Sequence, residues 1–151
     1  MTETWTKRLL LGSAVWNIGG ALVSLADPAQ HLAQMFSAPA PAGLDAVALF
    51  FYRCTWINVL AWGLAYGLAA CWPHSRAAVL AAGGAGKALY CAASVGLVLS
   101  GVGRPLVLVF GLADLAMALL FFWALWALWA QEAPLRAGAQ TRPGPAGALR
   151  P

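Results

Sequence analysis

The chain has 151 residues and a mass of 15.8 kDa, the length of one ordinary domain. Hydrophobic residues make up 62% of it and charged residues only 9%, too few charges to cover the surface of a water-soluble globular protein. The net charge of +4 is also too sparse for a nucleic-acid-binding face, so no nucleic-acid partner is expected and an integral membrane protein remains.

Four apolar runs are long enough to cross a bilayer, which takes about 20 residues in a helix. They cover residues 9–26, 47–72, 77–100 and 106–130. Turn-forming residues separate them, and the last two turns are short. The second, third and fourth spans are therefore predicted to be antiparallel neighbours. The sequence predicts one all-α membrane domain over residues 1–133, folded as a four-helix bundle in the lipid bilayer.

The first apolar run allows a second interpretation. Lys7 and Arg8, an apolar stretch and the small-x-small sequence of residues 24–26 resemble a secretory signal peptide with its cleavage site. Trp16 and Asn17 inside the run favour a retained span, because the apolar regions of signal peptides are usually plain leucine and alanine. Cleavage would leave three spans and an external amino terminus.

Lysine and arginine are concentrated on one predicted side of the membrane. That side carries Lys7, Arg8, Arg76, Arg136, Arg142 and Arg150, whereas the other side carries Arg104. Cytoplasmic segments of membrane proteins carry the excess of lysine and arginine. The sequence therefore predicts that both termini are cytoplasmic.

The segment between the first and second spans begins as a helix would. Asp27 is a good cap and Pro28 suits the first helical position. Apolar residues then recur at helical spacing, which predicts a short interfacial helix over residues 28–36, followed by an Ala/Pro hinge at 37–43. A plain loop is the alternative.

The tail, residues 134–151, lacks periodicity and is predicted to be disordered and cytoplasmic.

Two ionisable residues are predicted to meet inside the membrane. Lys87 lies about 16 Å along the third span from Arg76, and Asp114 about 13 Å along the fourth span from Pro105. The two spans run in opposite directions, so these depths match. An isolated charge at membrane depth costs at least about 2.5 kcal/mol. The sequence therefore predicts a Lys87–Asp114 pair inside the bundle.

Arg53, in the second span, has two possible positions. It can face inward and share Asp114 with Lys87, which would give the cluster one net positive charge and favour an anionic ligand. It can also reach outward to the head groups at little cost. Asn17 and Asn58 add neutral polarity to the first two spans, and we expect them to complete the polar core by hydrogen bonding between helices.

Other motifs suggest packing instead of chemistry. The stripes Gly63-x-x-x-Gly67 and Ala92-x-x-x-Gly96-x-x-x-Ser100 allow helices to approach closely, either within the bundle or in a dimer. His31 and His74 lie on opposite sides, which excludes a haem held by two histidines and makes a metal site an unpromising interpretation. The three cysteines form no CxxC motif and are expected to be buried thiols. We expect no metal, cofactor or catalytic residue.

Three short segments resemble a known group of proteins. They are Trp16-Asn17-Ile18-Gly19-Gly20 leading to Asp27-Pro28, then Gly86-Lys87, then Asp114-Leu115-Ala116-Met117-Ala118-Leu119-Leu120-Phe121. Together they resemble uncharacterised bacterial integral membrane proteins with four helices, which are similar in architecture to DoxX-like proteins. The resemblance covers the four spans, implies a four-helix bundle and draws attention to Asn17, Lys87 and Asp114. It implies no activity, and Ala113 stands where related patterns have glycine.

Three functions are compatible with these residues. The leading hypothesis is a multi-pass protein of the bacterial inner membrane that is not an enzyme, and that binds a small amphiphile at the polar core or serves as an accessory subunit of a larger membrane complex. The main alternative is a proton-coupled transporter, which would need a homodimer because four helices are few for alternating access. A membrane enzyme is the weakest hypothesis, because no nucleophile or metal-ligand set accompanies the charges. A cavity beside Lys87 would favour ligand binding or transport, and tight packing would favour a subunit of a complex.

Overall fold

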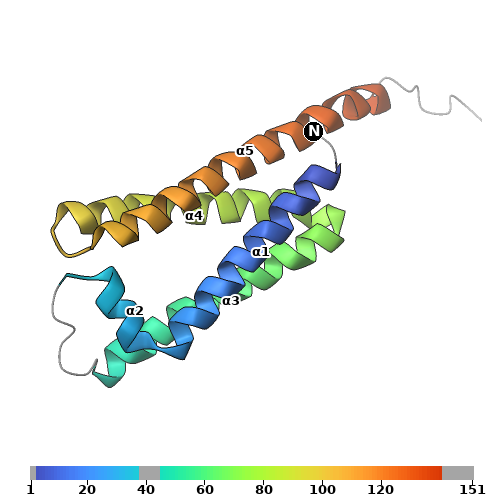
Figure 1. Ribbon diagram of the computed structural model, residues 1–151. Coiled ribbons are helices and arrows are strands. Elements are labelled where there is room, and N and C mark those ends of the chain that lie inside the picture. The colour runs from blue at the N-terminus through green and yellow to red at the C-terminus, as the bar shows by residue number, and fades with distance from the viewer. Residues whose placement is uncertain (1–2, 38–44, 141–151) are drawn as a thin grey trace, which may run out of the picture.

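The computed structural model describes residues 3–37 and 45–140, and nearly all of this backbone is helical (Figure 1). The elements in chain order are α1 (Glu3–Ala26), α2 (Pro28–Met35), α3 (Ala46–Cys71), the 3-10 turn η1 (Pro73–Ser75), α4 (Arg76–Leu99) and α5 (Pro105–Gln140). Helices α1, α3, α4 and α5 are long and apolar enough to cross a membrane, which confirms four apolar helices at the positions of the predicted spans.

Side-chain caps start two of the helices at the positions that the sequence indicates. The Asp27 carboxylate accepts a hydrogen bond of 2.9 Å from the Gln30 backbone N–H, and Pro28 occupies the first turn of α2. Asp45 caps α3 in the same way through the Ala48 N–H, at 2.7 Å. The interfacial segment is therefore a helix and not a plain loop. The predicted hinge falls almost wholly on residues 38–44, outside the described residues.

The long helices form two antiparallel pairs. Helix α1 packs along α3, and α4 packs along α5. The two pairs lie close together at the end of the molecule that carries the amino terminus and splay apart toward the other end, where α2 lies (Figure 1). The short turn through η1 does make α3 and α4 antiparallel, as predicted, but the main partner of α3 is α1.

Glycines set the closest approaches between helices. A Cβ atom added to Gly63 of α3 would lie 2.7 Å from Ile18 Cγ1 of α1, and one added to Gly111 of α5 would lie 2.8 Å from Ser94 Cβ of α4. Between α3 and α4 the Tyr66 ring lies against Gly83, and its hydroxyl would be 2.5 Å from a Cβ at that position. Tyr66 thus joins the two helix pairs at Gly83, although α3 and α4 are in contact over a much smaller length than α1 and α3 or α4 and α5.

The apolar core lies where the two pairs converge. Its buried residues come from all four long helices and are Leu10, Ala14, Tyr66, Ala69, Ala70, Leu80, Phe121, Ala124 and Leu125. Large apolar side chains are also exposed on every long helix, among them Val15, Leu64, Leu89 and Leu119. Exposed apolar side chains all around a bundle suit contact with lipid, where a water-soluble protein would place charges.

Helix α5 is longer than predicted. It continues to Gln140, through residues 134–140, where the sequence indicates a disordered tail. Pro134 removes one backbone donor, but alanine, leucine, arginine and glutamine around it are good helix formers, which favours continuation of the existing helix. The rest of the predicted tail, residues 141–151, lies outside the described residues.

Candidate functional site

Lys87 and Asp114 form an ion pair between α4 and α5, as predicted from their depths. Lys87 Nζ lies 2.7 Å from Asp114 Oδ1, and the two side chains are 5% and 15% exposed. Lys87 Nζ also donates a hydrogen bond of 3.1 Å to Asn17 Oδ1 of α1. The Lys87 side chain therefore joins the two helix pairs through a carboxylate on one side and an amide on the other.

Asn17 and Tyr66 complete the surroundings of the ammonium group. The Asn17 side-chain amide is 3.5 Å from the Val59 carbonyl oxygen of α3, to which it donates, so its oxygen is turned toward Lys87. The Tyr66 ring centroid lies 5.9 Å from Lys87 Nζ, within the range of a cation–π contact. Side chains from all four long helices thus surround one buried cation, and we call Lys87, Asp114 and Asn17 the polar triad.

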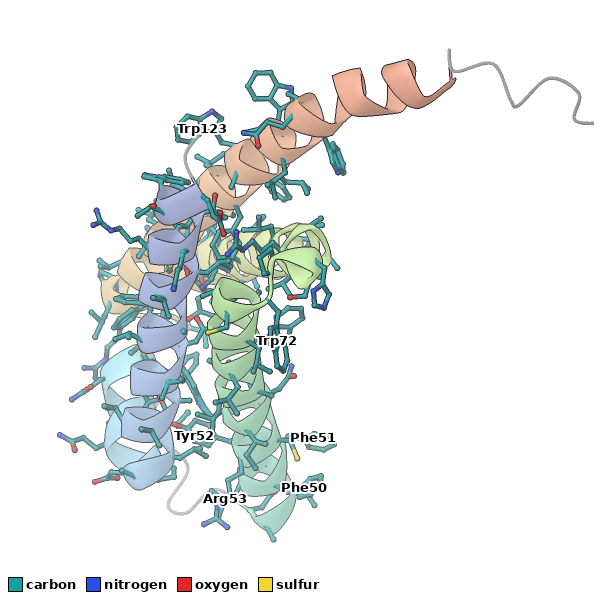
Figure 2. The ribbon with its side chains drawn as sticks, turned by 90° about the vertical axis from the view of Figure 1, so that its right-hand side faces the viewer. Phe50, Phe51, Tyr52, Arg53, Trp72 and Trp123 are labelled. Carbon is teal, nitrogen blue, oxygen red and sulfur yellow. The ribbon has the colours of Figure 1, made fainter. Side chains whose placement is uncertain are left out.

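Arg53 is not part of this triad, which corrects the inward position proposed for it. The residue is exposed, and Figure 2 shows it projecting away from the molecule near the amino-terminal end of α3. Burial of a third charge beside an ion pair would leave one cation uncompensated, whereas an exposed guanidinium keeps its hydration. The triad therefore has no net charge when Lys87 and Asp114 are both ionised.

A cavity of about 540 Å³ opens beside the triad, between the two helix pairs. The three residues of the triad line this cavity. Asn58 of α3 also lines it, but the hydrogen bonds of Lys87 go to Asn17 and Asp114 and not to Asn58. Small and aliphatic residues form part of the other cavity walls, and six aromatic side chains also line the cavity, from Trp16, Trp56, Trp62, Tyr66, Tyr90 and Phe110. The volume is within the range of small-molecule sites, about 300–1,000 Å³.

Helix α2 forms part of the wall of this cavity through His31, Gln34 and Met35. The Tyr52 hydroxyl of α3 donates to the Ser24 carbonyl oxygen at 2.9 Å and lies 2.8 Å from His31 Nδ1. Since a hydroxyl has one proton and a carbonyl can only accept, His31 Nδ1 must be the donor to Tyr52. His31 lies in α2, within the interfacial helix predicted over residues 28–36.

The other end of α2 is tied to the turn between α4 and α5. The Arg104 backbone N–H donates to the Met35 carbonyl at 2.8 Å, and the Arg104 side chain donates to the Phe36 carbonyl at 3.1 Å. The Ser37 N–H donates to the Val102 carbonyl at 2.8 Å. Helix α2 therefore bridges the splayed ends of the two helix pairs, an arrangement that the sequence does not reveal.

We expect the docking of α2 to weaken at acidic pH. Desolvation by burial holds the pKa of His31 below its ordinary value of 6.5, so the folded protein favours the neutral ring. The unfolded chain then binds more protons, and the contribution of His31 to stability is full above about pH 6.5 and falls as the pH drops below it. Hydrogen–deuterium exchange of residues 28–36, corrected for the intrinsic rate, should therefore increase between about pH 7.5 and 5.5. His31→Gln keeps a donor without titrating and should abolish this dependence; an unchanged dependence would show that another group causes it.

Arg76 is a second buried cation that sequence reasoning treated only as a marker of orientation. Its Nε and Nη2 donate to the carbonyls of Ala69 and Ala70 at 3.1 Å each, and its Nη1 lies 3.5 Å from Glu3 Oε1. These carbonyls belong to the last turn of α3, where the helix dipole is negative and no intrahelical donor remains. A signal for this cap is present in the sequence, because Arg76 follows the end of α3 by one short turn.

Within residues 3–37 and 45–140, no group of three or more His, Cys, Asp or Glu side chains could hold a metal ion. The cysteines were expected to be buried, which is correct for Cys91 alone, because Cys54 and Cys71 are exposed. Both lie on helix surfaces that would face lipid, where a thiol behaves as a small apolar group.

Comparison of the chain with protein-family models, curated proteins and solved structures finds no match.

Proposed function

We propose that this chain is a multi-pass protein of the bacterial inner membrane that binds a small amphiphile in the cavity between its two helix pairs. The observation that carries the proposal is the cavity of about 540 Å³ that ends at the buried Lys87–Asp114 pair. Charged groups inside membrane proteins are costly and mark ligand or ion pathways. The apolar walls suit the tail of an amphiphile, and the polar triad suits its head group.

The same cavity weighs against the role of an accessory subunit, which would need only tight packing. It also leaves a proton-coupled transporter as the alternative, because a lysine and an aspartate beside an open space could relay a proton. The exposed small residues Ala92 and Gly96 of α4, with Ser100 at its C-cap, would give a second copy a close approach in the homodimer that transport requires. Proton flux into vesicles that contain the purified protein would favour this alternative over a binding protein.

Filling the cavity tests amphiphile binding. Gly86 of α4 lines the cavity, and a Cβ atom added there meets nothing within 4 Å. Gly86→Leu should therefore fold normally and lower the retention of lipids that co-purify with the protein at the site. The measurement is mass spectrometry of the lipid extract, normalised to protein.

Gly12→Leu is the matched control, because Gly12 lies in α1 outside the cavity lining and its added Cβ also meets nothing within 4 Å. Both variants add the same apolar side chain to a helix. Binding in the cavity requires that Gly86→Leu alone depletes a co-purifying compound. Equal retention of every compound by the two variants and the native protein would contradict the proposal.

We further propose that both termini are cytoplasmic. Trp5 of α1 and Trp123 of α5 have ring centroids 5.1 Å apart, and this contact supports the placement of the start of α1 and the later part of α5 on one side. Lys7, Arg8 and Arg76 also belong to this side by their positions in the helices, and the excess of cations supports its placement in the cytoplasm. A reporter fused after Gln131 should be active only as a cytoplasmic reporter, and one fused after Ser37 only as an external reporter. The reverse result would show that both termini are external.

A further inference from the structure

We infer that the cavity takes an uncharged aromatic amphiphile whose head group donates a hydrogen bond to Asp114. This inference deepens the proposed binding function and depends on it. Three features carry it: the neutrality of the polar triad, the free accepting capacity of the Asp114 carboxylate, and the aromatic walls above them.

Charge arithmetic selects an uncharged head group. The lining contains one lysine and one aspartate, which pair at 2.7 Å and cancel. His31 is the remaining lining residue able to carry a positive charge, and its burial favours the neutral ring. An anionic or cationic head group would therefore bring one uncompensated charge into an apolar enclosure, which is strongly unfavourable.

The hydrogen bonds already present select a donor. Lys87 donates one hydrogen bond to Asn17 Oδ1 and one to Asp114 Oδ1. An ionised carboxylate has two oxygens and about four accepting positions. Among the described residues, Lys87 donates the hydrogen bond that Asp114 accepts, and this bond occupies one oxygen, Oδ1. A hydroxyl or N–H on the ligand can therefore bind the carboxylate without disturbing the ion pair.

The walls select a flat ring. Trp16 of α1 lies beside Phe110 of α5, with ring centroids 5.8 Å apart. This contact joins the two helix pairs, and beside it, within the α1–α3 pair, Trp62 and Tyr66 of α3 have centroids 5.9 Å apart. Aromatic rings prefer stacked or edge-to-face neighbours, which gives an aromatic ligand an advantage over an aliphatic one of equal area.

A set of matched naphthalene probes tests all three features on the full-length protein in nanodiscs of uncharged lipid. Tritiated 2-naphthol is the labelled probe, and specific binding is the amount bound above that of Gly86→Leu. Unlabelled 2-naphthol should displace it at concentrations at least about tenfold lower than 2-methoxynaphthalene, which lacks the donor, because a hydrogen bond to a charged group contributes that much. Three further competitors should also need concentrations at least about tenfold higher than 2-naphthol to displace the label. They are the anion 2-naphthoate, the cation 2-naphthylmethylammonium and the aliphatic 1-decanol.

The double variant Lys87→Met with Asp114→Leu identifies the groups that recognise the head. It keeps the aromatic lining of the cavity and removes the acceptor, so 2-naphthol and its methyl ether should displace the label at concentrations within about threefold of each other. Persistence of the native preference would overturn the assignment to Asp114. If a charged or aliphatic competitor binds best and Gly86→Leu blocks it, this inference fails and amphiphile binding stands; if no probe shows specific binding, both fail.

Discussion

Lys87→Met is expected to lower the free energy of unfolding by about 3–5 kcal/mol, because it leaves the Asp114 carboxylate buried without its counter-ion. Asp114→Leu should cost a similar amount, since the Lys87 ammonium group would keep only Asn17 and the Tyr66 ring as partners. Both single variants should accumulate poorly and unfold early. The measurement is thermal unfolding in detergent, followed by the loss of helical circular dichroism.

The double variant Lys87→Met with Asp114→Leu is expected to recover much of this loss. Apolar replacements of a buried ion pair are often neutral or stabilising once both charges are gone. A double variant as damaged as the sum of the two singles would mean that the ion pair at 2.7 Å contributes no coupling. If the double variant is stable and still retains its ligand, the role of the ion pair is structural. If it is stable but no longer retains the ligand, the ion pair contributes to binding.

Gly63→Ala is expected to cost about 1–3 kcal/mol through overpacking between α1 and α3. Its Cβ would lie 2.7 Å from Ile18 Cγ1, 3.1 Å from the Ile18 backbone nitrogen and 3.2 Å from Asn17 Cβ. The Ile18 side chain can rotate, but the backbone of α1 can only move away from α3. Because Asn17 moves with it, the hydrogen bond to Lys87 should also lengthen and ligand retention should fall.

Gly67→Ala provides the matched control one turn along the same helix. Its Cβ would lie 3.9 Å from Ala14 Cβ, an ordinary van der Waals contact. Replacement of glycine by alanine in a helix then has only its usual benefit, up to about 1 kcal/mol. Chemical unfolding of the two variants in parallel should show opposite shifts of the midpoint. Equal shifts would mean that α1 adjusts freely at Gly63 and that its packing is not tight.

Local sequence features were sufficient for the helices and for the central ion pair. Apolar runs of membrane length predicted four helices, and Asp27-Pro28 predicted the start of α2, because caps depend on residues a few positions apart. The Lys87–Asp114 pair was predictable because a short turn joins α4 to α5, so residues at equal distances from the turn come close together. For these features, neighbours in sequence are neighbours in space.

The orientation of Arg53, the partnership of Asn17 with Lys87, the bridge formed by α2 and the cavity were decided by the tertiary structure. Each depends on which face of a helix turns inward, and in a membrane protein that choice leaves little trace in the sequence, because lipid and the packed interior are equally apolar. Arg53 illustrates the difficulty: it could reach either Asp114 or the head groups, and only the packing of α3 against α1 turns it outward. The cavity lies between the two helix pairs, where Tyr66 packs against Gly83 and α2 bridges the splayed ends, and these contacts join residues far apart in the chain.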